Sequence, residues 1–435
     1  MNKIEKIDVV PKSLVIPFIL ITSMFALWGF ANAVTDPMVQ AFKKVLELSN
    51  SQAAWVQMAF YGGYFCMALP AAFFVRKYSY KVGVLIGLFL YALGAILFYP
   101  AAITEEFWFF CLGLYILTFG LAFLETTANP YILSMGKKET ATQRLNLAQA
   151  FNPIGSIGGL IIAQQFILKN LQSDNIVDFG FLDNTQKMMI KTSDLLVIRD
   201  PYVVLGLVVI IFFIIVALYK MPEGKDDSEI ETIPVTFKIL FNNKNYIFGV
   251  ISQLFYVGAQ IMCWTYIYQY AEALEISSQK ASNYQFIAFI LFFLGRIWGT
   301  YLLRSYNPGR LLMIFSFFSS ITILITIFTQ NVIGLYSLVL TSFFMSIMFP
   351  TIYGIALEEL NEEVSKIGAA GLVMAIVGGA LMPKFQGNII DLGGHEVNNI
   401  LILGVSEVNF SFILPLICFI IILLFGKHTS NSIMK

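Results

Sequence analysis

Charged residues are scarce in this chain of 435 residues. Asp, Glu, Lys and Arg make up 12% of it, against about 25% in an average soluble domain. So few charges cannot cover the surface of a soluble protein of this length. They also exclude a disordered chain and a nucleic-acid-binding protein, which both need many more charges. The 27 basic and 27 acidic residues cancel, so net charge implies neither a nucleic-acid nor a protein partner.

The residues that build metal and catalytic centres are also few. The chain has two histidines and four cysteines, and the cysteines lie singly in apolar runs, without a CxxC pair: Cys66, Cys111, Cys263 and Cys418. This pattern predicts neither a disulfide framework nor a metal site. The sequence contains no P-loop and no GxSxG motif. We therefore expect a protein that is not an enzyme and has no cofactor.

Apolar residues are abundant, at 58% of the chain. A membrane-spanning helix needs about 20 mostly apolar residues. Twelve runs meet this requirement: 14–41, 53–75, 82–102, 107–133, 145–168, 202–220, 246–272, 282–303, 310–328, 332–357, 366–389 and 408–426. The first is long and lacks a small-residue cleavage site, so we interpret it as a helix and not as a signal peptide. The sequence predicts an all-α membrane protein with twelve transmembrane helices.

Two polar stretches divide these runs. Residues 169–201 are expected to form a long outside loop. Residues 221–245 are expected to form a cytoplasmic linker between an N-terminal six-helix bundle, 1–220, and a C-terminal one, 246–435. Two six-helix halves are typical of secondary transporters. With a cytoplasmic N-terminus, 18 of the 27 basic residues fall on the inside, so the positive-inside rule predicts that both termini are cytoplasmic.

Three ionisable residues lie within the predicted spans, away from their ends: Asp36, Glu125 and Arg296. Such groups are costly in a membrane and are functional candidates by default. A buried carboxyl without a nearby cation can exist protonated and can carry a proton. Arg296 is a candidate for an intramembrane ion pair, although a structural role between helices is an equal alternative.

Amides and aromatic residues recur at helical spacing around these groups. Five stripes have residues spaced three or four apart: Trp28, Asn32 and Asp36; Gln57, Tyr61 and Tyr64; Glu125 and Asn129; Asn146, Gln149 and Asn152; Gln253, Tyr256, Gln260 and Trp264. Amides both donate and accept hydrogen bonds, and aromatic rings stack on sugars, so the stripes suit a neutral polyhydroxylated ligand. For any single amide, hydrogen bonding between helices is the alternative role.

Several longer motifs connect these residues. They include Phe25-Ala-Leu-Trp-Gly-Phe-Ala-Asn32 with Asp36-Pro37, Leu124-Glu-Thr-Thr-Ala-Asn-Pro-Tyr131 and Arg144-Leu-Asn-Leu-Ala-Gln-Ala-Phe-Asn-Pro153. These motifs resemble the fucose:proton symporter family of the major facilitator superfamily. The resemblance implies two six-helix bundles around a central cavity. It also implies essential carboxylates at Asp36 and Glu125, and a sugar-contacting amide at Asn152. The long 169–201 stretch resembles Bacteroidetes-type members of the family.

Residues and resemblance together predict a secondary active transporter of a bacterial inner membrane. It would import a neutral monosaccharide, with L-fucose favoured, by proton symport and alternating access. The proton would act through Asp36 and Glu125, and the sugar would bind at Trp28, Asn32, Asn129, Gln149, Asn152, Tyr256, Gln260 and Trp264. The alternatives are a glucose/galactose or N-acetylglucosamine carrier, a carrier using another cation, an uncoupled uniporter and a non-transporting membrane sugar sensor.

Overall fold

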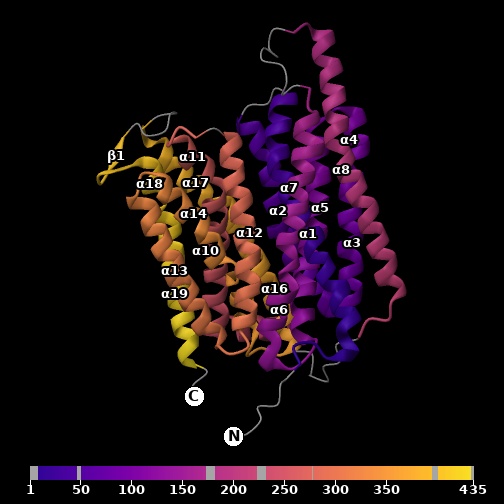
Figure 1. Ribbon diagram of the computed structural model, residues 1–435. Coiled ribbons are helices and arrows are strands. Elements are labelled where there is room, and N and C mark those ends of the chain that lie inside the picture. Colours follow the sequence, from indigo (N-terminus) through magenta and orange to yellow (C-terminus); the bar gives the residue numbers. More distant parts are fainter. Residues whose placement is uncertain are drawn as a thin grey trace. The chain divides into compact units, whose positions relative to one another are not determined.

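The computed structural model describes residues 8–46, 50–172, 182–222, 232–276, 278–393 and 400–432. Within some helices the side chains also lie outside the described part, and the side chain of Asp36 is one of these. Figure 1 shows the helices and one small hairpin in the colours of the sequence.

Long apolar helices dominate the chain. Its first part contains η1 (Lys12–Leu14), α1 (Val15–Val45), α2 (Asn50–Lys77), α3 (Tyr80–Ile96), α4 (Phe98–Thr104), α5 (Phe107–Ser134), η2 (Lys138–Thr140), α6 (Ala141–Gln149), α7 (Phe151–Ile162), the π-helix η3 (Ala163–Ile167), η4 (Leu168–Asn170) and α8 (Asn184–Leu218). Its second part contains α9 (Ile233–Asn242), α10 (Lys244–Thr265), α11 (Ile267–Glu272), α12 (Ser278–Leu302), α13 (Pro308–Phe328), α14 (Val332–Met345), α15 (Met348–Leu357), α16 (Glu362–Met374), η7 (Ala375–Val377), α17 (Gly378–Ile390), η8 (Asp391–Gly393), β1 (Leu401–Ile402), β2 (Val405–Ser406), α18 (Glu407–Ser411) and α19 (Ile413–Ser432). Among the described residues, twelve helical runs are long and apolar enough to cross a membrane.

The chain forms two compact units that do not follow the halves of the sequence. One unit comprises Met1–Phe18, Asn129–Pro153 and Asp226–Lys435, and the other comprises Ile19–Ala128 and Ile154–Lys225. We call them the C-unit and the N-unit. The end of α5, all of α6 and the start of α7 therefore belong to the C-unit, although they lie in the N-terminal half of the sequence. The domain boundaries at 220 and 246 stay a prediction.

In the N-unit, α3 and α4 both pack beside α8 (Figure 1). The contact is built from aromatic and small residues. Phe98 of α4 stacks on Tyr202 of α8 with ring centroids 4.0 Å apart. Gly206 of α8 faces Ile96 closely, where a larger residue would require the neighbour to shift. Small residues at helix contacts let backbones approach in a membrane, where burial of apolar surface adds little.

In the C-unit, α13 packs along α19 and α14, and α10 packs along α19, α17 and α15. Glycines mark the closest approach of α13 and α19. A side chain at Gly426 would lie 2.7 Å from the backbone nitrogen of Met313, and one at Gly309 would collide with Thr429. The β1–β2 hairpin pairs Leu401 with Ser406 in antiparallel fashion and precedes α18 (Figure 1).

Two expected loops contain helices. The prediction of a loop over 169–201 was wrong for its second part, because α8 begins at Asn184. Asp183 caps this helix by accepting a hydrogen bond from the backbone nitrogen of Gln186. The buried Asp194 accepts a 2.8 Å bond from the backbone nitrogen of Gln172. In the expected linker, α9 occupies Ile233–Asn242, with a proline in its first turn where no hydrogen-bond donor is needed.

Candidate functional site

An aromatic cluster surrounds the predicted site residues of α1 in the N-unit. The Trp28 ring stacks on Phe25 at 5.8 Å and on Tyr64 of α2 at 6.3 Å between centroids. Trp28 is buried, and Asn32, one turn further along α1, is half-buried. The side chain of Asp36 lies outside the described residues, so its predicted role stays a prediction.

Glu125 lies in the middle of α5 and is 1% exposed. A carboxyl group buried this deeply in a membrane-spanning helix needs hydrogen bonds or a proton to stay there. It interacts electrostatically with Tyr64 of α2, the residue that also stacks on Trp28. Tyr64 thus connects two predicted site residues of the N-unit. The spacing of Gln57, Tyr61 and Tyr64 places Tyr64 on a polar stripe but does not predict this connection, because a tyrosine in an apolar helix is commonly a packing residue.

In the C-unit, Arg296 of α12 is the centre of a second cluster. Its guanidinium lies 4.6 Å from the ring centroid of Phe292, and the Phe292 ring also contacts that of Trp264, at 5.1 Å between centroids. The Trp264 indole nitrogen donates a 3.2 Å bond to the Ser342 hydroxyl. Tyr256, about two turns before Trp264 on α10, is buried and interacts electrostatically with Arg296.

The partners of the Arg296 side chain are backbone carbonyls. Nε donates a 2.6 Å bond to the carbonyl of Ser346, and Nη1 donates a 2.9 Å bond to the carbonyl of Gln149. Among the described residues, no carboxylate forms a salt bridge with it. The described partners of Arg296 are therefore backbone carbonyls, whereas an ion pair would require a carboxylate.

The side chain of Gln149 extends this cluster to α5. Its Nε2 donates a 2.8 Å bond to Oδ1 of Asn129, and both side chains are buried. Four predicted site residues, Asn129, Gln149, Tyr256 and Trp264, thus reach Arg296 directly or through one neighbour. Gln260 and Asn152 are half-buried, and Asn152 lies in the first turn of α7, just after the break between α6 and α7.

One face of α6 is bonded to α12 and α15. Gln143 donates a 3.2 Å bond to the carbonyl of Thr300, and Asn146 donates a 3.2 Å bond to the hydroxyl of Thr351. Thr142 packs closely against Gly354, and a side chain at position 354 would collide with the Thr142 side chain. Asn146 of the predicted amide stripe therefore forms a hydrogen bond between helices, which is the alternative role considered for each amide.

Arg144 has a structural role that the sequence did not predict. It is fully buried and donates to the carbonyls of Ile132 and Leu133, in the last turn of α5, at 2.7 and 2.5 Å. Its Nη1 also donates to the carbonyl of Val9 and to the hydroxyl of Thr140. A basic residue near a loop is usually exposed, so position in the sequence gave no sign of this role.

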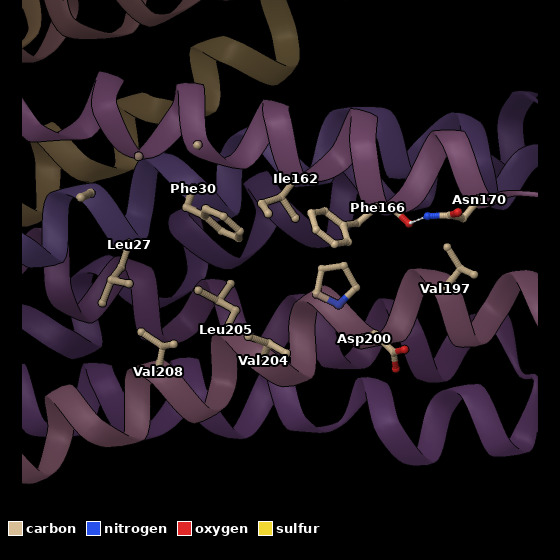
Figure 2. Close-up of a pocket in the computed structure, with 14 residues that line it drawn as sticks. Leu27, Phe30, Ile162, Phe166, Asn170, Val197, Asp200, Val204, Leu205 and Val208 are labelled. Atoms are coloured by element: carbon tan, nitrogen blue, oxygen red, sulfur yellow. Dashed lines mark hydrogen bonds between the residues drawn. The ribbon is translucent and has the colours of Figure 1, made fainter.

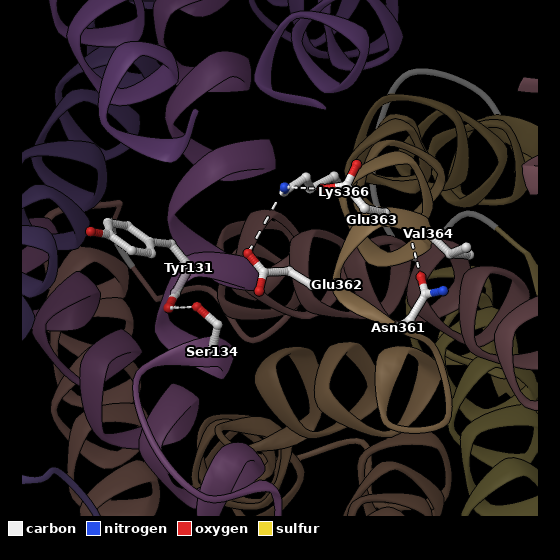
Figure 3. Close-up of polar contacts among 7 residues, drawn as sticks. All are labelled: Tyr131, Ser134, Asn361, Glu362, Glu363, Val364 and Lys366. Atoms are coloured by element: carbon white, nitrogen blue, oxygen red, sulfur yellow. Dashed lines mark hydrogen bonds and ion pairs between the residues drawn. The ribbon is translucent and has the colours of Figure 1, made fainter. Parts of the chain in front are cut away.

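A charged cluster at the start of α16 lies beside the end of α5. Figure 3 shows Lys366 directed towards Glu362 and Glu363. The nitrogen–oxygen distance to Glu362 is 3.9 Å, and Tyr131 of α5 interacts electrostatically with Glu362. Acidic residues in the first turn of a helix interact favourably with its dipole. Asn361 caps this helix, because its Oδ1 accepts a 2.8 Å bond from the backbone nitrogen of Val364.

A groove of about 700 Å³ lies in the N-unit between α1, α7 and α8. Figure 2 shows its apolar lining, which includes Phe30, Ile162 and Phe166. Its polar residues are Asn170, whose amide donates to the Phe166 carbonyl at 3.0 Å, and Asp200. None of the predicted sugar-binding residues lines it. A sugar needs several converging donors and acceptors, so this groove does not fit the expected ligand.

The N-unit cluster contains a group that can hold a proton, and each of the two clusters contains groups that can bind hydroxyls. Buried Glu125 offers a carboxyl for proton binding. Amides and indole or phenol rings offer hydrogen bonds and stacking. Among the described residues, no three His, Cys, Asp or Glu side chains gather as a metal site would require.

Comparison with known proteins places the chain in a family. The profile of the Major Facilitator Superfamily matches residues 18–383. An L-fucose-proton symporter of Haemophilus influenzae is 54% identical over 96% of this chain and 97% of its own. An L-fucose-proton symporter of Escherichia coli is 34% identical over 97% of this chain and 94% of its own. The chain therefore belongs to the major facilitator superfamily and, within it, to the family of the L-fucose-proton symporters, which are transporters and not enzymes.

Solved structures agree with this assignment. The crystal structure of the transporter FucP in the outward conformation has a TM-score of 0.85 at 33% identity, and covers 96% of this chain and 99% of that one. The structure of a double tryptophan mutant of XylE, at 13% identity and a TM-score of 0.72, shares the fold. The predicted family and the predicted fold of twelve membrane-spanning helices are confirmed.

Proposed function

We propose that this protein imports L-fucose together with a proton, by alternating access, across a bacterial inner membrane. The observation that carries the proposal is the 54% identity, over nearly the whole length of both chains, to an L-fucose-proton symporter. The buried carboxyl of Glu125 supports it, because a transporter driven by protons needs an ionisable group within the membrane. The excess of basic residues on one side supports cytoplasmic termini.

In this proposal the proton binds at Glu125 and Asp36. The sugar hydroxyls bind the amides of Asn32, Asn129, Gln149, Asn152 and Gln260, and the sugar ring stacks on Trp28, Tyr256 or Trp264. Tyr64 joins the two functions, since it stacks on Trp28 and interacts with Glu125. A change of charge at Glu125 would reach the sugar-stacking ring through this residue.

The test is uptake of radiolabelled L-fucose by proteoliposomes with and without an inward proton gradient. We expect accumulation only with the gradient, and expect Glu125→Gln to abolish accumulation while exchange of internal for external sugar continues. Uptake that ignores the gradient, or a fully coupled Glu125→Gln variant, would contradict proton symport. Binding without exchange would instead favour a sensor.

A glucose or galactose carrier is the second candidate. A glucose/galactose transporter of Brucella abortus is 30% identical over 95% of this chain. Competition of unlabelled D-glucose, D-galactose and L-fucose against labelled L-fucose separates the two. We expect L-fucose to compete at the lowest concentration.

A further inference from the structure

Two helical breaks in the C-unit, between α6 and α7 and between α14 and α15, are each followed within a few residues by a proline, and each leaves a carbonyl without its helical donor. Proline has no backbone N–H, so the carbonyl four residues before it accepts no helical hydrogen bond. Four residues before Pro153 is Gln149, where α6 ends. Four residues before Pro350 is Ser346, between α14 and α15.

Arg296 donates to both of these carbonyls. Nη1 bonds the Gln149 carbonyl and Nε bonds the Ser346 carbonyl. The side chain is 3% exposed, and a guanidinium stays charged in proteins. A buried charge of this kind is stable only when it is hydrogen-bonded, and an unbonded carbonyl in a membrane costs several kcal/mol. The two hydrogen bonds therefore stabilise the buried guanidinium and both buried carbonyls.

The two bonds join segments that are far apart in the sequence. Gln149 belongs to the segment 129–153, whose chain continues on both sides into the N-unit, whereas Ser346 and Arg296 belong to the C-terminal half. We infer that Arg296 is a positioning residue for transport: its bonds to Gln149 and Ser346, the Arg296 latch, hold this segment against α12 and α15. The inference rests on the proposed alternating access, in which the segment and the C-terminal half separate.

Chemistry explains how such a latch can open. When the helices separate, water reaches the two carbonyls and the guanidinium and replaces the bonds that they lose. The other contacts of this face are weaker, since they join neutral amides, hydroxyls and carbonyls at 3.2 Å. The latch also fixes the break just before Asn152, a predicted sugar-binding residue, and so links closure of this face to the shape of the sugar site.

The test uses cysteine labelling, which needs neither sugar nor a proton gradient. In a chain whose four native cysteines are replaced by alanine, Thr142→Cys reports on the buried face of α6 against Gly354. Ser337→Cys is the matched control, because Ser337 is equally buried but bonds within α13 and α14. We expect Arg296→Gln to raise maleimide labelling of Thr142→Cys by about tenfold or more, a typical size for conformational coupling, with Ser337→Cys unchanged. Arg296→Lys should lie between, because an ammonium group cannot reproduce the fork of two donors.

A second variant leaves Arg296 in place. Pro153→Ala returns an N–H donor to Gln149 and so weakens the latch by competition. It should raise labelling of Thr142→Cys in the same direction, and it tests the inference even where Arg296→Gln does not fold. Labelling of Thr142→Cys that stays at its starting level in every folded variant would overturn the latch. So would equal rises at both cysteines. Failure of L-fucose uptake alone would instead count against the proposed function.

Discussion

The side-chain amide of Gln149 donates a hydrogen bond of 2.8 Å to Oδ1 of Asn129, which joins the end of α6 to α5. Both residues are buried, so the loss of the donor leaves a desolvated oxygen without this partner. Burying a polar atom that has lost its hydrogen bond costs about 1–3 kcal/mol. The same pair lies in the proposed sugar site, so its removal should affect both stability and binding.

We predict that Gln149→Ala lowers the free energy of unfolding by about 1–3 kcal/mol and weakens L-fucose binding. Gln143→Ala is the matched control, because Gln143 lies on the same helix and donates to the backbone of Thr300. Thermal unfolding in detergent and equilibrium binding of labelled L-fucose measure the two effects. Equal effects of both variants on binding would remove Gln149 from the sugar site.

The positions of the spans could be predicted from the sequence because the membrane leaves a strong signal. Every span needs about 20 apolar residues, and a buried carboxyl such as Glu125 stands out against that background. The start of α8 was not predicted, because the aspartate and lysine residues in its first turns interrupt the apolar run that predicts a span. Its cap at Asp183 and the buried bond of Asp194 to Gln172 depend on tertiary contacts that no local pattern contains.

The partners of Arg296 could not be predicted for a different reason. Sequence reasoning pairs a buried cation with a carboxylate, because side-chain charges are visible in a sequence. The acceptors are instead carbonyls freed by Pro153 and Pro350, and every residue has a carbonyl. The sequence shows the prolines, but it does not show which cation binds the freed carbonyls, because this depends on how helices distant in the sequence pack.

We predict that Arg144→Lys destabilises the protein strongly. The Arg144 guanidinium spans the carbonyls of Ile132 and Leu133 at the end of α5, and a lysine ammonium cannot reproduce this planar fork. The expected loss is about 2–4 kcal/mol, as for a broken buried hydrogen-bond network. The change in melting temperature measures it. Arg310→Lys, at an exposed arginine, should change the melting temperature little, and a similar change in both variants would contradict the prediction.

Stability should depend on pH through Glu358, which follows α15 outside the membrane-spanning helices. Partial burial and the neighbouring Glu359 raise the pKa of Glu358, and Lys138 opposes them. The folded chain therefore holds this proton at higher pH than the unfolded chain. The stabilisation that results is fully present below the pKa of an unfolded glutamate, about 4.3, and is lost as pH rises through the raised pKa of the folded state.

The melting temperature of Glu358→Gln should therefore decrease less than that of the wild type between pH 4 and neutral pH. The effect should stay below about 1 kcal/mol, because solvent screens a partly exposed carboxylate. Melting curves of both proteins across this range measure it. Glu106→Gln removes an exposed carboxylate elsewhere and serves as the control. Parallel curves for the wild type and Glu358→Gln would contradict the assigned cause.

Two neighbouring glycines of α7 should respond in opposite ways to the same change. A side chain at Gly155 would overlap the carbonyl oxygen of Ala26 in α1, whereas a side chain at Gly158 would meet nothing within 4 Å. Gly155→Ala must push α1 and α7 apart and should cost about 1–3 kcal/mol or more, as overpacking of a tight contact does. Gly158→Ala should be neutral or stabilise the protein by up to about 1 kcal/mol, the difference in helix propensity between the two residues. Melting temperatures of the two variants in detergent measure this contrast. A Gly155→Ala variant as stable as Gly158→Ala would show that α1 and α7 do not touch at this point.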